Sequence, residues 1–105
     1  MKNCPGAPAV LGFRTEHHAE AAALLPHAEV VVEPTLVTEL VEEGFDVLAC
    51  GPEPMLRAIC DRWPDAQLAC EAPMACGYGA CWGCAVEIDG ELKRLCVEGP
   101  VLRAA

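Results

Sequence analysis

The sequence has few basic residues, few aromatic residues and no long apolar run. It contains seven lysines and arginines against 16 aspartates and glutamates, for a formal charge of −9. Binding to nucleic acid or to an anionic membrane surface depends on clustered Lys and Arg side chains, so we expect neither kind of partner. An acidic chain of this kind is suited to a basic docking face on another protein.

The apolar runs are too short for a membrane span. None approaches the roughly 18 residues of a membrane-spanning helix, and the N-terminal stretch "MKNCPGAPAVLGFRTEHH" has no apolar segment long enough for a signal peptide. We therefore expect a cytoplasmic protein, in which thiols stay reduced. The eight cysteines are then interpreted as metal ligands and buried thiols rather than as disulfides.

Aromatic residues make up 5% of the chain and apolar residues 53%. Aliphatic side chains and alanine must therefore form the core. A chain of 105 residues buries only roughly 60–70% of the surface of its unfolded state, so a structural metal or a partner subunit would stabilise it.

The first two-thirds of the chain alternates strand-like and helix-like segments. Short apolar runs predict strands over residues 9–13, 28–32 and 45–50. Helices are predicted from the N-cap Thr15 to Leu25, from the N-cap Thr35 to Gly44, and from the Gly-Pro turn after residue 50 to about Trp63. This order predicts an α/β fold with a parallel sheet and right-handed crossovers.

The character of the sequence changes near Glu71, where a loop, several cysteines and a predicted hairpin follow one another. Two short strands flank Asp89–Gly90, a dipeptide typical of a type I′ turn. We therefore divide the chain into an α/β domain over residues 1–71 and a cysteine-rich module over residues 72–105.

Four cysteines have the spacing of a metal site: Cys76-x4-Cys81-x2-Cys84-x11-Cys96. With Asp89–Gly90 as the turn, the hairpin register places Cys96 opposite Gly83 and directly beside Cys84. The hairpin thus returns the fourth thiol to the loop that carries the other three.

The loop pattern C-x4-C-x2-C is that of plant-type [2Fe–2S] ferredoxins. Such a loop must approach an inorganic core closely with its N–H groups directed at the sulfurs, and glycines such as Gly77, Gly79 and Gly83 permit this. Zinc is the alternative, although structural zinc sites usually combine two short Cys-x2–4-Cys pairs. The spacing therefore favours an iron–sulfur cluster over zinc.

Three segments carry a family resemblance: "CGPEPML" (Cys50–Leu56), "MACGYGACWGCAVEI" (Met74–Ile88) and "LCVEGPVL" (Leu95–Leu102). Together they resemble the electron-transfer subunits of dihydroorotate dehydrogenase B, over about residues 9–102. The resemblance implies a ferredoxin-reductase-like chain with FAD, a [2Fe–2S] cluster and NAD. Such a chain passes electrons between NADH and the flavin of a catalytic subunit in pyrimidine biosynthesis.

The resemblance also implies site residues. The family's cluster ligands match Cys76, Cys81, Cys84 and Cys96. The turn beside nicotinamide and flavin matches Cys50, Gly51 and Pro52. A Gly-Pro turn between a parallel strand and a helix is also where open α/β sheets place ligands. No catalytic residue is predicted.

The 105 residues lack the family's FAD-binding barrel and its first strand with the glycine-rich turn. We therefore expect residues 1–71 to form a truncated pyridine-nucleotide-binding-like domain, which does not bind FAD by itself and binds NAD weakly or not at all.

The leading hypothesis is a [2Fe–2S] electron relay without substrate chemistry of its own. Its expected partners are flavoprotein subunits, among them a dihydroorotate dehydrogenase catalytic subunit, with self-association into a homo-oligomer as the other possibility. Two alternatives stay open. One is a zinc-stapled interaction module, and the other is a non-redox remnant of the electron-transfer subunit.

Overall fold

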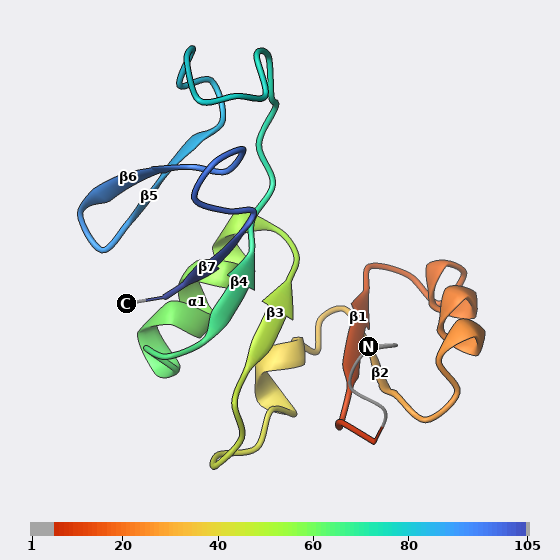
Figure 1. The fold of residues 1–105 in the computed structure, drawn as a ribbon. Coiled ribbons are helices and arrows are strands. Elements are labelled where there is room, and N and C mark those ends of the chain that lie inside the picture. Colours follow the sequence, from red (N-terminus) through yellow and green to blue (C-terminus); the bar gives the residue numbers. More distant parts are fainter. Residues whose placement is uncertain (1–5, 105) are drawn as a thin grey trace. The chain divides into compact units, whose positions relative to one another are not determined.

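The computed structural model describes residues 6–104 of the chain. It divides into two compact units, Met1–Glu43 and Gly44–Ala105. Each unit has its own short β-structure (Figure 1). None of the described helices is long and apolar enough to cross a membrane.

The first unit is built on two parallel strands. β1 (Val10–Phe13) pairs with β2 (Glu29–Val32), and the 3-10 helix η1 (His18–Leu24) lies in the connection between them. Ala9 and Val31 are buried. Both strands were predicted from their short apolar runs, and the structure confirms them.

The helices of this unit are shorter than predicted. η1 begins only at His18, whose N–H donates to the Thr15 hydroxyl at 3.3 Å. The second predicted helix, residues 35–44, is reduced to a 3-10 turn, η2 (Val37–Glu39). The prediction of a full helix was wrong because β-branched residues recur in this stretch and lose rotamer freedom in a helix. Glu42–Glu43 would also lie at its negative C-terminal end.

The second unit contains a three-stranded sheet in the order β3-β4-β7. β3 (Leu48–Cys50) and β4 (Gln67–Ala69) are parallel, and β7 (Val101–Arg103) pairs antiparallel with β4. Leu68 and Leu102 are directly paired across β4 and β7, and both are buried. This pair therefore anchors the C-terminal strand in the core.

Helix α1 (Glu53–Arg62) connects β3 to β4. Pro54 lies in its first turn, where a missing N–H costs no hydrogen bond. Leu56 and Ile59 are its buried residues, three positions apart and so on one face. Pro64 follows directly after the residue that caps the helix. The predicted third helix is thus confirmed.

The parallel strands do not form the single sheet that we expected. Among the described strands, the parallel pairs β1-β2 and β3-β4 belong to separate sheets. The free edge of β4 is occupied by β7, which reaches it antiparallel from the far end of the sequence. The fold is therefore a small α/β arrangement of short sheets.

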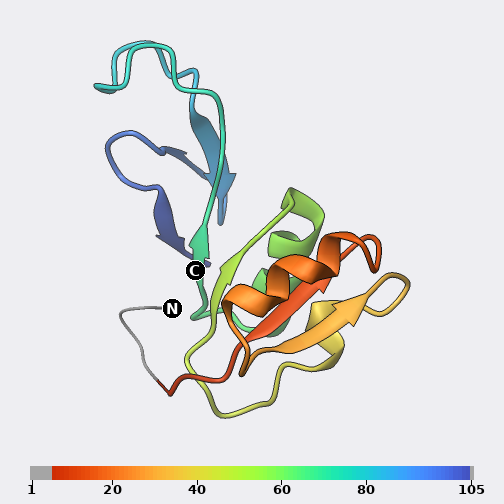
Figure 2. The same cartoon turned by 90° about the vertical axis from the view of Figure 1, so that its right-hand side faces the viewer.

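The cysteine-rich segment lies between β4 and β7. It contains the two-stranded hairpin of β5 (Ala85–Ile88) and β6 (Glu91–Arg94), and the loop that precedes β5 lies beyond the open end of this hairpin (Figure 2). Because β7 returns to the sheet, the compact second unit begins at Gly44 and includes this segment. The division at residue 71 stays a prediction about sequence modules.

Candidate metal centre

The hairpin has the predicted register. Ile88 lies opposite Glu91, and the two turn residues Asp89 and Gly90 have φ values of 52° and 76°. Positive φ at both central positions defines a type I′ turn, which matches the right-handed twist of the strands. The N–H of Leu95 donates to the carbonyl of Cys84 at 3.4 Å, so the pairing continues past the strand ends toward the cysteines.

This register brings Cys84 and Cys96 together. Their sulfurs are 3.4 Å apart, and the N–H of Cys96 approaches the Cys84 sulfur at 3.5 Å. That N–H lowers the pKa of Cys84, whereas the hydrogen bond with the Cys84 sulfur raises the pKa of Cys96. Cys84 is buried and Cys96 is half-buried.

The other two predicted ligands form a second pair within the loop. The N–H of Cys81 donates to the Cys76 sulfur at 3.4 Å, and the N–H of Gly83 donates to the Cys81 sulfur at 3.2 Å. The N–H groups of Tyr78 and then Cys81 lower the pKa of Cys76 to about 6. Backbone donors therefore stabilise thiolate at this end of the site.

The loop can surround the sulfurs because of its backbone conformation. Gly77 and Gly79 have φ values of 74° and 88°, and Trp82 has a φ of 60°. At Gly83 there is little room, since a Cβ atom would lie 3.3 Å from the Cys81 sulfur. Gly77 and Gly79 adopt the left-handed conformation without steric cost, and Gly83 permits the close approach to the Cys81 sulfur, as we expected for this loop.

The four cysteines thus occur as two pairs, Cys76 with Cys81 and Cys84 with Cys96. Within residues 6–104, no group of three or more His, Cys, Asp or Glu side chains is close enough together to hold one metal ion. A two-iron cluster bound by four cysteines gives each iron two protein thiolates. Paired thiols with N–H groups directed at them therefore fit such a cluster.

The remaining described cysteines have a different environment. Burial raises the pKa of both Cys60 and Cys70, and a buried thiol with a raised pKa behaves as a small apolar side chain. All seven described cysteines are free of disulfides. Cys4 lies outside the described residues.

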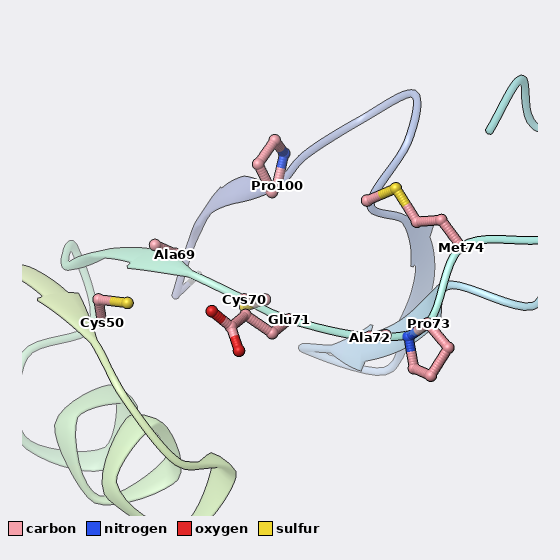
Figure 3. Close-up of a pocket in the computed structure, with 8 residues that line it drawn as sticks. All are labelled: Cys50, Ala69, Cys70, Glu71, Ala72, Pro73, Met74 and Pro100. Atoms are coloured by element: carbon pink, nitrogen blue, oxygen red, sulfur yellow. The ribbon is translucent and has the colours of Figure 1, made fainter.

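The predicted nucleotide turn lies at the junction of β3 and α1. Cys50, at the end of β3, lines an open pocket of about 620 Å³ (Figure 3). The other lining residues come mainly from the chain that leaves β4, including Glu71 and Met74. Gly51 and Pro52 are not lining residues, and a Cβ at Gly51 would lie 2.5 Å from the Met55 side chain. Of the three predicted residues, the structure thus brings Cys50 to the pocket.

Sequence reasoning missed Arg94. Its guanidinium donates to the Gly79 carbonyl at 3.0 Å and pairs with Glu98 at 2.6 Å. The hydrogen bonds with Arg94 lower the pKa of Glu98 to about 2. Arg94 lies two residues before Cys96 in the sequence, but this spacing does not show which part of the loop its side chain contacts.

Comparison with known proteins bears on the same segment. Residues 71–105 match the family model described as the iron-sulfur cluster binding domain of dihydroorotate dehydrogenase B. Over these residues the chain is similar to that domain. The resemblance expected from the cysteine motif is thereby confirmed, and the domain family supports an iron–sulfur cofactor rather than zinc.

The curated relatives are similar over a longer stretch. The electron transfer subunit of dihydroorotate dehydrogenase B (NAD(+)) from Bacillus caldolyticus is 46% identical in an alignment of length 77, which covers 65% of this chain and 30% of the relative. The homolog of that subunit from Aquifex aeolicus (strain VF5) is 44% identical in an alignment of length 72, which covers 63% of this chain and 29% of the relative. The chain thus spans about 30% of the length of the curated relatives it matches.

Proposed function

We propose that this chain is a [2Fe–2S] electron carrier that relays electrons between a flavin reduced by NADH and a partner flavoprotein. The observation that carries the proposal is the pairing of the four thiols in a segment similar to the iron-sulfur cluster binding domain. The cluster, when bound, supplies one-electron chemistry. No substrate chemistry is assigned to the chain itself.

Each protein group has a definite task in this proposal. Cys76, Cys81, Cys84 and Cys96 would hold the irons as thiolates. The N–H groups around Cys76 and Cys81 favour the anionic sulfurs, and hydrogen bonds of this kind tune the potential of a cluster. These N–H groups should raise the reduction potential. The formal charge of −9 should lower it, because reduction adds an electron to an already acidic protein.

The partner we propose is a dihydroorotate dehydrogenase catalytic subunit, as the names of the relatives suggest. The chain would then serve pyrimidine biosynthesis in the cytoplasm. The segments before the cysteines would correspond to part of a ferredoxin-reductase-type nucleotide-binding domain. The pocket beside Cys50 is where a flavin or nicotinamide of the complex would approach.

Anaerobic purification followed by metal and sulfide analysis tests the cluster. The expected result is a brown protein with iron and acid-labile sulfide in equal amounts, about two of each per chain. A colourless protein with about one zinc per chain would contradict the proposal and support the zinc-stapled module. A protein without metal would support the non-redox remnant.

A further inference from the structure

The side chain of Arg94 links the cysteine loop to the end of the hairpin. Its Nη1 atom donates to the carbonyl of Gly79 at 3.0 Å. The guanidinium carbon also lies 4.7 Å from the centre of the Trp82 ring, within the range of a cation–π contact. Gly79 and Trp82 both lie between the first and third cysteines of the loop, so Arg94 holds the loop at two points.

The same guanidinium is fixed on its other side by Glu98. Nη2 and Nε of Arg94 reach the carboxylate of Glu98 at 2.6 and 3.2 Å, and the backbone N–H of Arg94 donates to it at 2.7 Å. The two side chains are only 25% and 34% exposed. A forked, partly shielded pair of this kind is stronger and better oriented than an exposed ion pair.

The fit between loop and hairpin end is close. A Cβ atom at Gly79 would lie 2.7 Å from Cγ2 of Val97 and 3.1 Å from Nη1 of Arg94. Gly79 is thus packed against the segment that follows β6. This segment carries Cys96, whereas the loop carries the other three cysteines.

We propose that Arg94 is a positioning residue for the iron–sulfur centre, which fixes the loop with three ligands to the segment with the fourth. The inference rests on the proposed function. Only the planar fork of arginine can bind Gly79 and Glu98 and stack on Trp82 at the same time. Its positive charge, two residues from Cys96, also favours the reduced state of the cluster.

The first test compares holo-protein variants. Arg94→Lys keeps the charge without the fork, Arg94→Met removes both, and Lys93→Met is the matched control, because Lys93 pairs with Glu91 instead. In a chelator challenge, both Arg94 variants should lose the cluster roughly tenfold faster than the wild type, the factor expected for one charge-assisted hydrogen bond. The midpoint potential should fall in Arg94→Met and stay near the wild-type value in Arg94→Lys and Lys93→Met.

Wild-type rates of cluster loss in both Arg94 variants would overturn the inference. So would equal acceleration in Lys93→Met. If Arg94→Met does not fold, Arg94→Lys and Glu98→Gln replace it, because each keeps a polar group of similar size. Both should then lose the cluster faster than the wild type and Lys93→Met.

The second test uses the metal-free, reduced chain and separates this inference from the proposed function. Hydrogen exchange followed by mass spectrometry should show faster exchange over residues 77–83 in both Arg94 variants, and no change in Lys93→Met. Unchanged exchange in the Arg94 variants would contradict the positioning role. If the wild type carries no iron or sulfide, the proposed function fails, and the exchange rates still decide whether Arg94 orders the loop.

Discussion

The sulfur of Cys76 is surrounded by backbone donors, and its pKa is about 6. In the metal-free, reduced chain, the Cys76 thiolate should therefore form as the pH rises through about 6, well below the ordinary range of a thiol. Cys70 provides the contrast, because burial raises its pKa. A pulse of iodoacetamide between about pH 5 and pH 9, followed by peptide mass spectrometry, should modify Cys76 first. Identical pH profiles for the two cysteines would contradict this environment.

The ligand assignment predicts a second difference between cysteines. Serine at any of positions 76, 81, 84 or 96 should sharply reduce the iron and sulfide content and the visible absorption, since an alcohol replaces a thiolate ligand. Cys60→Ser is the control, because Cys60 lies in α1 outside the two thiol pairs. Loss of the absorption in Cys60→Ser, with Cys96→Ser unaffected, would overturn the assignment.

Arg94 shows which part of the site the sequence cannot reveal. The cysteine spacing and the Asp-Gly turn act over short distances along the chain, so they predict both the ligands and the placement of Cys96 beside Cys84. The contacts of Arg94 with Gly79 and Trp82 depend instead on how the loop folds back onto the hairpin. No residue pattern along the strand reports that path.

Among the helices and strands, the hairpin of β5 and β6 is the element on which the centre depends. Gly90 has a φ of 76° and open space around its Cβ position, so its requirement for glycine is conformational. Gly90→Ala should therefore lower the free energy of unfolding by about 1–2 kcal/mol and speed the loss of the cluster. Asp89→Asn is the control, because asparagine tolerates the same region. Urea unfolding of the metal-free chain measures this free energy. Equal stability of Gly90→Ala and the wild type would contradict the conformational requirement for glycine at this position.

The elements that were predicted correctly are those with strong local signals. The Asp-Gly turn and the proline in the first turn of α1 each fix a boundary independently of the rest of the chain. The helix expected over residues 35–44 had an apolar pattern, but its β-branched residues and the acidic pair at its C-terminal end oppose a helix. The parallel sheet was predicted from the order of elements, which does not reveal that β7 would occupy the edge of β4.

For the chain as a unit, the exposed side chains of the cysteine loop point to association with another protein. Tyr78 and Trp82 are 76% and 49% exposed beside the thiol pairs. An electron partner must approach this loop, and aromatic side chains are favoured in the centres of interfaces. We therefore predict that the holo-protein forms a complex with a flavoprotein, or else self-associates.

Size-exclusion chromatography with light scattering, on the holo-protein mixed with a dihydroorotate dehydrogenase catalytic subunit, tests this association. A complex should form and should weaken as the ionic strength rises, because the chain carries a formal charge of −9. Tyr78→Ser should reduce the complex, whereas Arg57→Lys, at an exposed position of α1, should not. A stable monomer that binds no flavoprotein would contradict the relay and support the remnant.

The pairing of β4 with β7 has a consequence for how such a protein can be assembled. Ala69 lies opposite Val101, and the N–H of Cys70 donates to the carbonyl of Pro100 at 2.9 Å. The chain therefore leaves the sheet and re-enters it at neighbouring strands, which lie about 4.8 Å apart. The residues between these two points are therefore an insertion whose two ends adjoin on paired strands. We expect that a segment joined in this way can be replaced by a short turn while β4 and β7 keep their register.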